Sequence, residues 1–254
     1  MGKKPRKISI YNAKGGVDKS SIAENISHAL AIEGYKVLLV ECDMQRNASS
    51  ILPEEPVYTI TDVITERALF SQAIHKAREN FFIVPADEKL DRASNYIISG
   101  GRKAYSTLRK VIEKLDSYDF ILFDHSPSWS ALAHAAFLAS DELLVPCRLE
   151  PFAIDGLFSM FNKLQDELED HEIAITGIIP TSVDFSSNMT HQYLEKLKEA
   201  FKEKVTCIIR QDKQVPRSQA YKRTIFEHNP KSKASKDIHE LVQWIINTGD
   251  TNNA

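Results

Sequence analysis

The chain has 254 residues, of which 43% are apolar and 26% charged, the proportions of an ordinary globular protein. Its formal net charge of −3 gives no general affinity for polyanions, and no stretch is long and apolar enough to span a bilayer. The cysteines, Cys42, Cys147 and Cys207, have no metal or redox spacing and are odd in number, which indicates a reducing cytoplasmic setting rather than a disulfide framework.

Short apolar runs alternate with longer helical patterns along the whole chain. The expected strands are 7–11, 36–42, 81–85, 120–124, 142–147, 173–180 and 205–209, and the expected helices are 20–33, 102–115, 129–139, 154–168, 189–202 and 235–246. The runs 37–40 and 120–123 are continuously apolar, as in strands covered on both faces. The alternation predicts an α/β fold, with a mostly parallel twisted sheet flanked by helices on both faces. We expect one domain over 1–254, with frayed ends at 1–6 and 247–254.

A glycine-rich turn follows the first expected strand and opens the first expected helix. It reads Lys14-Gly15-Gly16-Val17-Asp18-Lys19-Ser20-Ser21. A strand, a glycine turn, Lys-Ser and a helix cradle nucleotide phosphates, because backbone N–H groups and the helix dipole face the anion. We expect Lys19 to reach the β- and γ-phosphates and the Ser20 hydroxyl to bind Mg²⁺. Residues 14–21 are therefore predicted to bind a nucleotide, in a P-loop NTPase fold.

Asp18 stands where the usual pattern has glycine. Its carboxylate adds negative charge beside a polyanion, and two unit charges about 4 Å apart repel by on the order of 4 kcal/mol at an effective dielectric near 20. It also has Lys19 as a neighbour with which to pair, while aspartate tolerates left-handed geometry better than most residues. We expect a loop that binds nucleotide weakly or hydrolyses it poorly. Two explanations stay open: a partner compensates, or the residue is an inactivating substitution in an otherwise normal enzyme.

Aspartates end two later strands. Asp43 lies in the sequence Glu-Cys-Asp-Met-Gln at 41–45, and Asp124 ends the strand at 120–124. An apolar strand that ends in aspartate places a carboxylate beside Mg²⁺ and its water, at the sheet edge where the glycine turn lies. The alternative for Asp43 is a simple helix cap. His125 between Asp124 and Ser126 suggests a hydrolase triad, but no nucleophile elbow surrounds Ser126.

Basic residues concentrate in the segment 210–236. It has eight basic residues against two acids, so it carries +6 while the rest of the chain carries −9. A basic patch on an acidic body is a candidate contact surface for nucleic-acid phosphates, although such a segment is more often a solvated face. The last helix pairs its apolar residues with His239, Glu240 and Gln243 rather than with lysines, which favours core packing over attachment to a membrane.

Together these residues resemble the deviant Walker A ATPases of the ParA/MinD group, and most of all the ParA-type DNA partition ATPases. The resemblance covers nearly the whole chain and extends to 144–147 and 150–157. It implies an ATP hydrolase that uses ATP and Mg²⁺ and forms an ATP-sandwiched homodimer. In this resemblance Lys14 reaches the phosphates of the partner subunit, Lys19 holds those of its own, and Asp43 orients or activates the attacking water. Ser20, Asp43 and Asp124 serve the metal.

The resemblance also implies macromolecular partners. The segment 215–220 is similar to the family's loop near the adenine, with Pro216 at the nucleotide, and it leads into a surface that binds non-specific DNA. Lys213, Arg217, Lys222 and Arg223 are the expected DNA contacts. A ParB-like centromere-binding or adaptor protein is expected to stimulate hydrolysis, in a cytoplasmic, nucleoid-associated protein with no membrane attachment.

Other functions stay open beside this one. A MinD-like membrane-associated positioning ATPase shares the motifs, and so does a variant in which Asp18 impairs nucleotide binding. A reductase similar to the nitrogenase iron protein is excluded, because the three cysteines are not spaced to hold a cluster.

Overall fold

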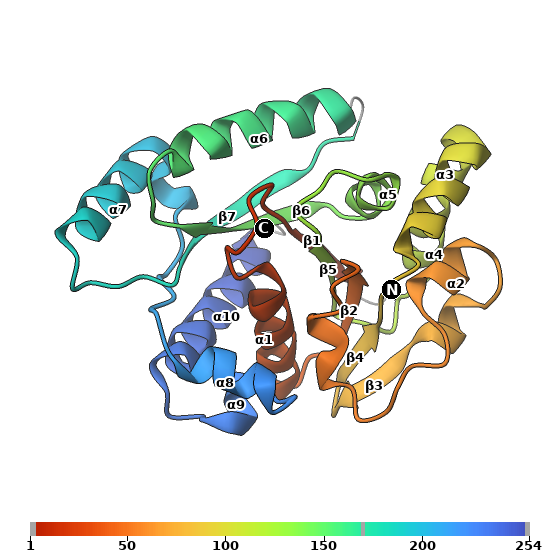
Figure 1. The fold of residues 1–254 in the computed structure, drawn as a ribbon, viewed down its shortest axis with the longest axis horizontal. Coiled ribbons are helices and arrows are strands. Elements are labelled where there is room, and N and C mark those ends of the chain that lie inside the picture. The colour runs from red at the N-terminus through yellow and green to blue at the C-terminus, as the bar shows by residue number, and fades with distance from the viewer. Residues whose placement is uncertain (1–3, 169–170, 252–254) are drawn as a thin grey trace.

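The computed structural model describes residues 4–168 and 171–251. Within them one sheet of seven strands runs through the molecule in the order β3-β4-β2-β5-β1-β6-β7 (Figure 1). The strands are β1 (Arg6–Ile10), β2 (Val37–Cys42), β3 (His75–Arg78), β4 (Phe81–Val84), β5 (Phe120–His125), β6 (Glu142–Arg148) and β7 (Ala174–Thr181). Neighbours pair in parallel, except β3, which is antiparallel to β4. The predicted mostly parallel sheet is confirmed.

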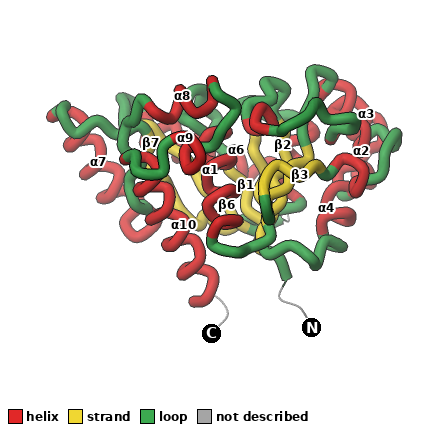
Figure 2. Tube along the Cα trace, turned by 90° about the horizontal axis from the view of Figure 1, so that it is seen from below, coloured by secondary structure: helices red, strands yellow, loops and turns green. Residues whose placement is uncertain are grey.

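Helices cover both faces of the sheet (Figures 1 and 2). One face packs against α1 (Lys19–Ile32), α9 (Ile225–His228) and α10 (Lys233–Thr251). The other packs against α2 (Ile60–Ile64), α3 (Leu90–Tyr105), α4 (Thr107–Ile112), α5 (Ala131–Leu138) and α6 (Ala153–Leu168), with α7 (Asn188–Phe201) outside α6. The strands alternate accordingly: Leu39 packs on the α1 side, and Leu38 and Val40 on the α3 side. A further helix, α8 (Gln214–Ala220), precedes α9.

Three local expectations differ from the structure. The segment 205–209 is not a strand: it follows β7 through isolated bridges at Val205 and Arg210. The edge strand β3 has the sequence His-Lys-Ala-Arg, which contains no apolar run, because an edge strand is only partly covered. The expected helix at 102–115 is the end of α3 followed by α4, and α3 itself is interrupted at Gly101, whose φ is 61°.

The described parts of both termini are ordered elements rather than frayed ends. Arg6 begins β1, and its guanidinium donates from Nε to Glu142 Oε1 at 2.8 Å and from Nη1 to the carbonyl of Ile245. This contact ties the first strand to α10, which continues to Thr251. Residues 1–3 and 252–254, also expected to be frayed, lie outside the described residues.

The last helix is part of the core. Leu241, Val242 and Ile245 are fully buried, and α10 contacts α1. None of the helices in the described ranges combines the length and the apolarity needed to cross a membrane.

Glu24 places a carboxyl group inside this core. It lies on α1 with 0% of its surface exposed, and neither carboxyl oxygen has a hydrogen-bond partner among the described residues. Burial raises the pKa of Glu24 well above 4.5; the charge of Arg78 acts to lower it, and those of Glu227 and Asp124 act to raise it. The folded protein therefore holds this group protonated at pH values where the unfolded chain ionises it.

We expect Glu24→Met to stabilise the fold, because it removes an unpartnered polar group from an apolar site. At about pH 8 the free energy of unfolding should rise by about 1–3 kcal/mol. The gain should shrink as the pH falls toward 4.5, since the unfolded chain then no longer ionises the glutamate. Denaturant titrations across this pH range measure both effects, with exposed Glu199→Met on α7 as control. A gain that does not change with pH would contradict the assignment.

Candidate functional site

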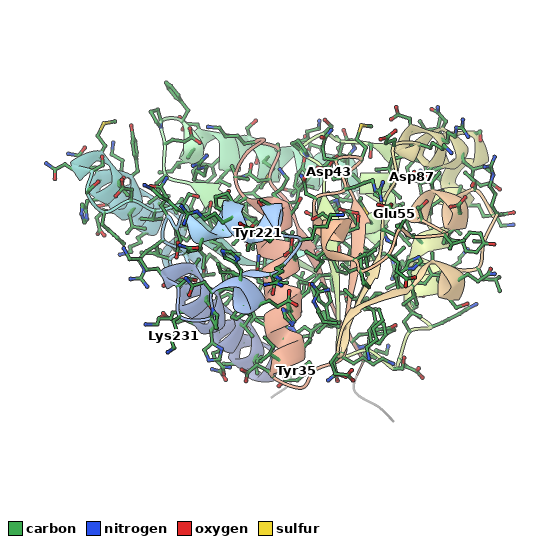
Figure 3. The ribbon with its side chains drawn as sticks, turned by 60° about the horizontal axis from the view of Figure 1, so that its bottom comes forward. Tyr35, Asp43, Glu55, Asp87, Tyr221 and Lys231 are labelled. Carbon is green, nitrogen blue, oxygen red and sulfur yellow. The ribbon has the colours of Figure 1, made fainter. Side chains whose placement is uncertain are left out.

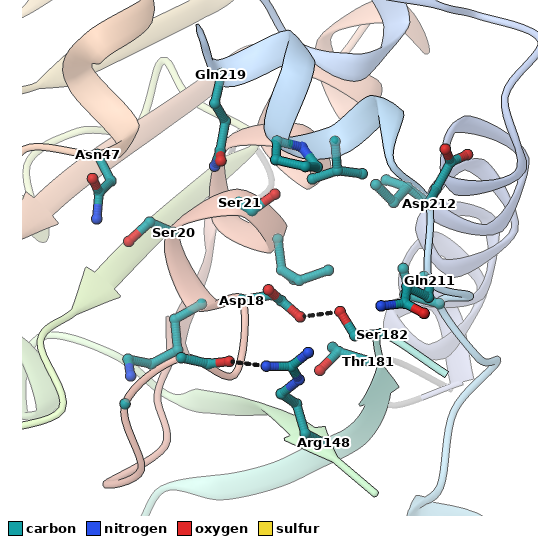
Figure 4. Close-up of a pocket in the computed structure, with 18 of the residues that line it drawn as sticks. Asp18, Ser20, Ser21, Asn47, Arg148, Thr181, Ser182, Gln211, Asp212 and Gln219 are labelled. Carbon is teal, nitrogen blue, oxygen red and sulfur yellow. Dashed lines mark hydrogen bonds between the residues drawn. The ribbon is translucent and has the colours of Figure 1, made fainter. Parts of the chain in front are cut away.

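The carboxyl ends of five neighbouring strands bring the predicted site residues to one edge of the sheet. In the order β2, β5, β1, β6 and β7, these ends carry Asp43, Asp124, the glycine turn, Arg148 and Ser182. A cavity of about 600 Å³ opens there, lined by the turn on one side and by residues of the segment 209–219 on the other (Figure 4). In α/β proteins, ligands bind outside the carboxyl ends of the parallel strands.

The glycine turn is held in a conformation that exposes backbone donors. Gly16 and Asp18 both have positive φ, 71° and 67°. The first helical hydrogen bond of α1 runs from Ile22 N to Asp18 O, so the N–H groups of 19–21 have no acceptor within the helix. These donors and the helix dipole make the turn an anion site.

Neighbouring strands brace the turn from behind. The Asn12 amide donates to the carbonyl of Pro146 at 2.8 Å and accepts from Lys14 N at 2.9 Å. Thr181, at the end of β7, donates to the carbonyl of Val17 at 3.3 Å. The sequence reasoning missed Asn12, whose only signal is an amide directly after the first strand. The turn is thus fixed from two adjacent strands before any ligand binds.

Lys19 lies between the turn and the two aspartates. It is 6% exposed, and its Nζ donates to the carbonyl of Lys14 at 3.0 Å. Burial lowers the pKa of Lys19, while the charges of Asp124 and Asp43 act to raise it. An ammonium has three donors, and one of them is used by Lys14, so Lys19 keeps donors for an anion in the turn.

Asp124 is a buried carboxyl group without a partner. It is 0% exposed, and neither side-chain oxygen forms a hydrogen bond with any described residue. Burial and the charge of Glu41 raise the pKa of Asp124, while the Ser20 hydroxyl and Lys19 lower it. A carboxylate beside a hydroxyl and otherwise unpartnered fits the water shell of Mg²⁺, which binds oxygen ligands and keeps several waters.

Asp43 forms a local turn and is not the helix cap of the alternative interpretation, because the next helix begins at Ala48 with Asn47 as its N-cap. Asp43 lines the cavity, and its Oδ1 accepts from Gln45 N at 3.0 Å as a local turn cap. Glu41, two residues before Asp43, holds the loop that follows β2. Its carboxylate accepts hydrogen bonds from the backbone N–H groups of Ala48, Ser49 and Ala86. The sequence analysis assigned no role to Glu41, although a glutamate within an otherwise apolar strand indicates that its carboxylate has a structural or functional role.

The expected pairing between Asp18 and Lys19 is absent. The carboxylate of Asp18 instead accepts a hydrogen bond of 2.7 Å from the hydroxyl of Ser182, just after β7 (Figure 4). The left-handed backbone turns the Asp18 side chain toward β7, whereas Lys19 reaches back under the turn to the Lys14 carbonyl. Asp18 therefore leaves Lys19 available, and its negative charge stays at the cavity wall.

The remaining residues of the turn divide between two cavities. Gly15, Gly16, Ser20 and Ser21 line the large cavity together with Asp18, Lys19, Asp43 and Pro216. Lys14 and Val17 line a smaller neighbouring cavity of about 230 Å³ instead. The Lys14 ammonium forms an ion pair with Glu150 at 2.9 Å, with side-chain exposures of 49% and 41%.

Not every basic residue of the segment 210–236 has its charge available to a partner, although the sequence alone would indicate that each does. Arg210 is bound to buried Asp237, with Nη2–Oδ1 and Nε–Oδ2 distances of 2.5 and 2.9 Å, so its charge is neutralised within the fold. The expected DNA contacts are exposed and lie at α8 or next to it: Lys213, Arg217, Lys222 and Arg223. Figure 3 shows Tyr221 near the middle of the molecule and Lys231 nearer its edge, and Lys222 lines a cavity together with Glu54, Glu55 and Glu88.

His125 takes no part in the cavity. It is fully buried, its Nε2 lies 2.8 Å from the Ser9 hydroxyl, and its ring stacks on Phe137 with centroids 4.3 Å apart. Burial lowers the pKa of His125 to about 3, so the ring is neutral. The Ser126 hydroxyl donates to the carbonyl of Ser128 at 3.1 Å. The two side chains form no nucleophile–base pair.

Comparisons with known proteins identify the family and the fold. A family model described as an AAA domain matches residues 5–176. The sporulation initiation inhibitor protein Soj of Bacillus subtilis is 27% identical over 249 residues, covering 95% of this chain and 98% of Soj. An ATP complex of Cyanothece McdA has a TM-score of 0.84 at 20% identity, covering 97% and 98% of the two chains. The Mg-ADP complex of the septum site-determining protein MinD from Pyrococcus horikoshii has a TM-score of 0.78 at 24% identity, covering 95% and 96%.

The left-handed backbone at position 18 predicts which side chains the turn accepts. We expect Asp18→Val to lower the free energy of unfolding by about 1–2 kcal/mol, because a β-branched residue is strained at this φ. Asp18→Asn should stay within about 0.5 kcal/mol of the parent, since asparagine adopts this conformation and still accepts from Ser182. Thermal and urea denaturation of both variants measure the difference. Equal losses in the two variants would show that the turn is not left-handed here.

Proposed function

The chain belongs to the AAA domain family as a ParA/MinD-type P-loop ATPase, and we propose that it is a ParA-like partition ATPase whose ATP-bound homodimer binds DNA without sequence preference. The observation that carries this proposal is the position of α8. Pro216 and Gln219 of this helix line the cavity, while Arg217 of the same helix is exposed beside Lys222 and Arg223. One short helix thus joins the nucleotide site to the basic surface.

The arrangement of the cavity supports ATP with Mg²⁺ as its ligand. The N-terminus of α1 and the Lys19 ammonium would hold the phosphates, and Pro216, which also lines the cavity, would contact the base. Ser20, Asp43 and Asp124 hold the metal, either directly or through its waters. Bound Mg²⁺ neutralises part of the phosphate charge and polarises the γ-phosphate. Mg²⁺ held beside Asp124 would favour the ionised form of its carboxyl group, because a nearby cation favours the charged form.

Hydrolysis requires a water held in line with the γ-phosphate. Asp43 has one carboxyl oxygen fixed by Gln45 N, which leaves the other to orient or activate this water. Lys14 acts from the partner subunit, where it stabilises the charge of the transition state. Its ion pair with Glu150 is half exposed, and such pairs contribute about 0–1 kcal/mol, so Lys14 leaves it at little cost.

The exposed basic residues at and beside α8 form the surface that binds DNA in the proposed function. Each subunit presents Lys213, Arg217, Lys222 and Arg223, and dimerisation presents two such sets. A ParB-like centromere-binding or adaptor protein stimulates hydrolysis and so releases the dimer from DNA. In the cell the protein is nucleoid-associated while ATP is bound. Attachment to a membrane in the MinD manner receives no support from α10, whose apolar side chains are buried against α1.

A second candidate is a protein of this fold that binds nucleotide poorly, and Asp18 is the observation that favours it. The two candidates differ in whether ATP with Mg²⁺ raises the melting temperature, because a ligand stabilises a protein only by binding the folded state. Stabilisation by ATP·Mg²⁺ supports the ATPase. Its absence supports the impaired protein.

The decisive experiment measures binding to non-specific duplex DNA without nucleotide, with ADP·Mg²⁺ and with ATP·Mg²⁺. We expect binding only with ATP, with a slope near −5 for log affinity against log salt, since two surfaces that neutralise about three phosphates each contribute ~0.9 per phosphate. Replacing Arg217, Lys222 and Arg223 by glutamate should remove DNA binding and leave stabilisation by ATP intact.

The matched control makes the same change of charge elsewhere. Lys196, Lys198 and Lys204, at α7 and just after it, are exposed, and their replacement by glutamate should leave most DNA binding in place. Equal losses in the two triple variants would reduce the effect to net charge and contradict the proposed surface. DNA binding that does not depend on ATP would contradict the nucleotide switch.

A further inference from the structure

A third basic side chain meets the glycine turn besides Lys14 and Lys19. Arg148 is the last residue of β6, which pairs in parallel with β1 through Ile8↔Glu142 and Ile10↔Leu144. The end of β6 therefore lies beside the turn that follows β1. Arg148 is exposed and lines the large cavity, and its Nη1 donates to the carbonyl of Gly16 at 3.2 Å (Figure 4). Four N–H donors of its guanidinium are left for another acceptor.

The charge of Asp18 has no cation paired with it. Its carboxylate is held by a neutral hydroxyl, that of Ser182, and the salt bridges of residues 4–168 and 171–251 include none to Asp18. Asp18 and Arg148 face the same cavity from adjacent sides in Figure 4. A phosphate in the turn would therefore meet two charges that a turn with glycine at position 18 and no arginine at position 148 lacks. They are the negative charge of Asp18 and the positive charge of Arg148.

The other two lysines do not provide this extra positive charge. Lys19 is part of any turn of this type, and it is buried against the Lys14 carbonyl and near Asp124 and Asp43. Lys14 lines the neighbouring cavity and pairs with Glu150 in its own subunit, and in the proposed dimer it serves the phosphates of the partner subunit, with or without an aspartate at position 18. Arg148, in contrast, forms no salt bridge in the described part of the chain, and a guanidinium matches phosphate oxygens in geometry and charge.

We propose that Arg148 is a further phosphate-binding residue of the ATP site, and that its guanidinium offsets the negative charge that Asp18 adds to the cavity. This inference rests on the proposed function, because it assumes that ATP binds in the turn. It names the compensating partner of Asp18 within the chain itself, at the end of a neighbouring strand.

The test is a set of ATP·Mg²⁺ affinities measured by calorimetry on the full chain. Arg148→Gln should weaken binding by about tenfold, Asp18→Asn should strengthen it by about tenfold, and the double variant should return to within about threefold of the parent. Asp18→Asn is the matched change, because it removes the charge and keeps both the backbone conformation and the acceptor for Ser182. Arg109→Gln, an exposed arginine that pairs with Glu113 on α4, is the control and should change nothing.

Two readouts separate charge from a merely structural role of the Gly16 contact. Arg148→Lys should keep most of the affinity, since it keeps the positive charge. The difference between the parent and Arg148→Gln should also shrink as salt is raised, because salt screens an exposed charge. Circular dichroism of each variant shows that it is folded before its affinity is used.

Every result supports or overturns the inference. Equal affinities of Arg148→Gln and the parent overturn it, and so does an equal loss in Arg148→Lys and Arg148→Gln. If the parent fails to bind ATP while Asp18→Asn binds it, the site stands but Arg148 does not compensate. If neither binds ATP, the proposed function itself fails.

Discussion

The turn between β1 and α1 is the constraint on which the rest of the molecule depends. A helix that begins at Lys19 leaves the N–H groups of its first turn without acceptors, and they are useful only if the turn before them stays open toward the cavity. The fold holds it open with hydrogen bonds from two strands, through Asn12 to β6 and through Thr181 of β7. The parallel order of the sheet then decides what else can reach the same place.

The site contains buried ionisable groups, whose burial lowers the stability of the folded protein. Asp124 and Lys19 lie within reach of each other's charge below the turn, where burial disfavours the charged form of both. Glu41 offsets part of the same penalty by accepting three backbone hydrogen bonds, although burial still raises its pKa, whereas Glu24 accepts none from the described residues. A ligand that binds the cavity of the folded protein would raise the free energy of unfolding, because it stabilises the folded state alone.

The departure from glycine at position 18 has local and distant consequences. Locally, aspartate occupies the left-handed conformation that the turn requires, with φ 67° and ψ 21°. At a distance, it connects the turn to Ser182 at the end of β7, while Arg148 at the end of β6 contacts Gly16. The charge beside the turn is thus set by Asp18 and by Arg148 at the end of β6, while the neutral Ser182 after β7 holds the Asp18 carboxylate.

Residue patterns along the chain predict those elements whose signals lie in neighbouring residues. Apolar runs identified β1, β2, β5 and β6, and the order of Lys14 to Ser21, with Asp43 and Asp124 at strand ends, placed the site at one sheet edge. Patterning also predicted α1 and α6 to within two residues at each end. Patterning failed for β3, because this edge strand is only partly covered by helices, and for the segment 205–209, which pairs with β7 only through isolated bridges.

Only the tertiary structure decided which distant side chains meet. Asp18 and Ser182, Gly16 and Arg148, and Arg6 and Glu142 are each separated by more than a hundred positions. Arg210, which counts as a free cation in the sequence, is neutralised by Asp237 on α10. Local patterning depends on the period and polarity of neighbouring residues, whereas these contacts depend on the order of strands in the sheet. That order is fixed by the packing of the whole chain.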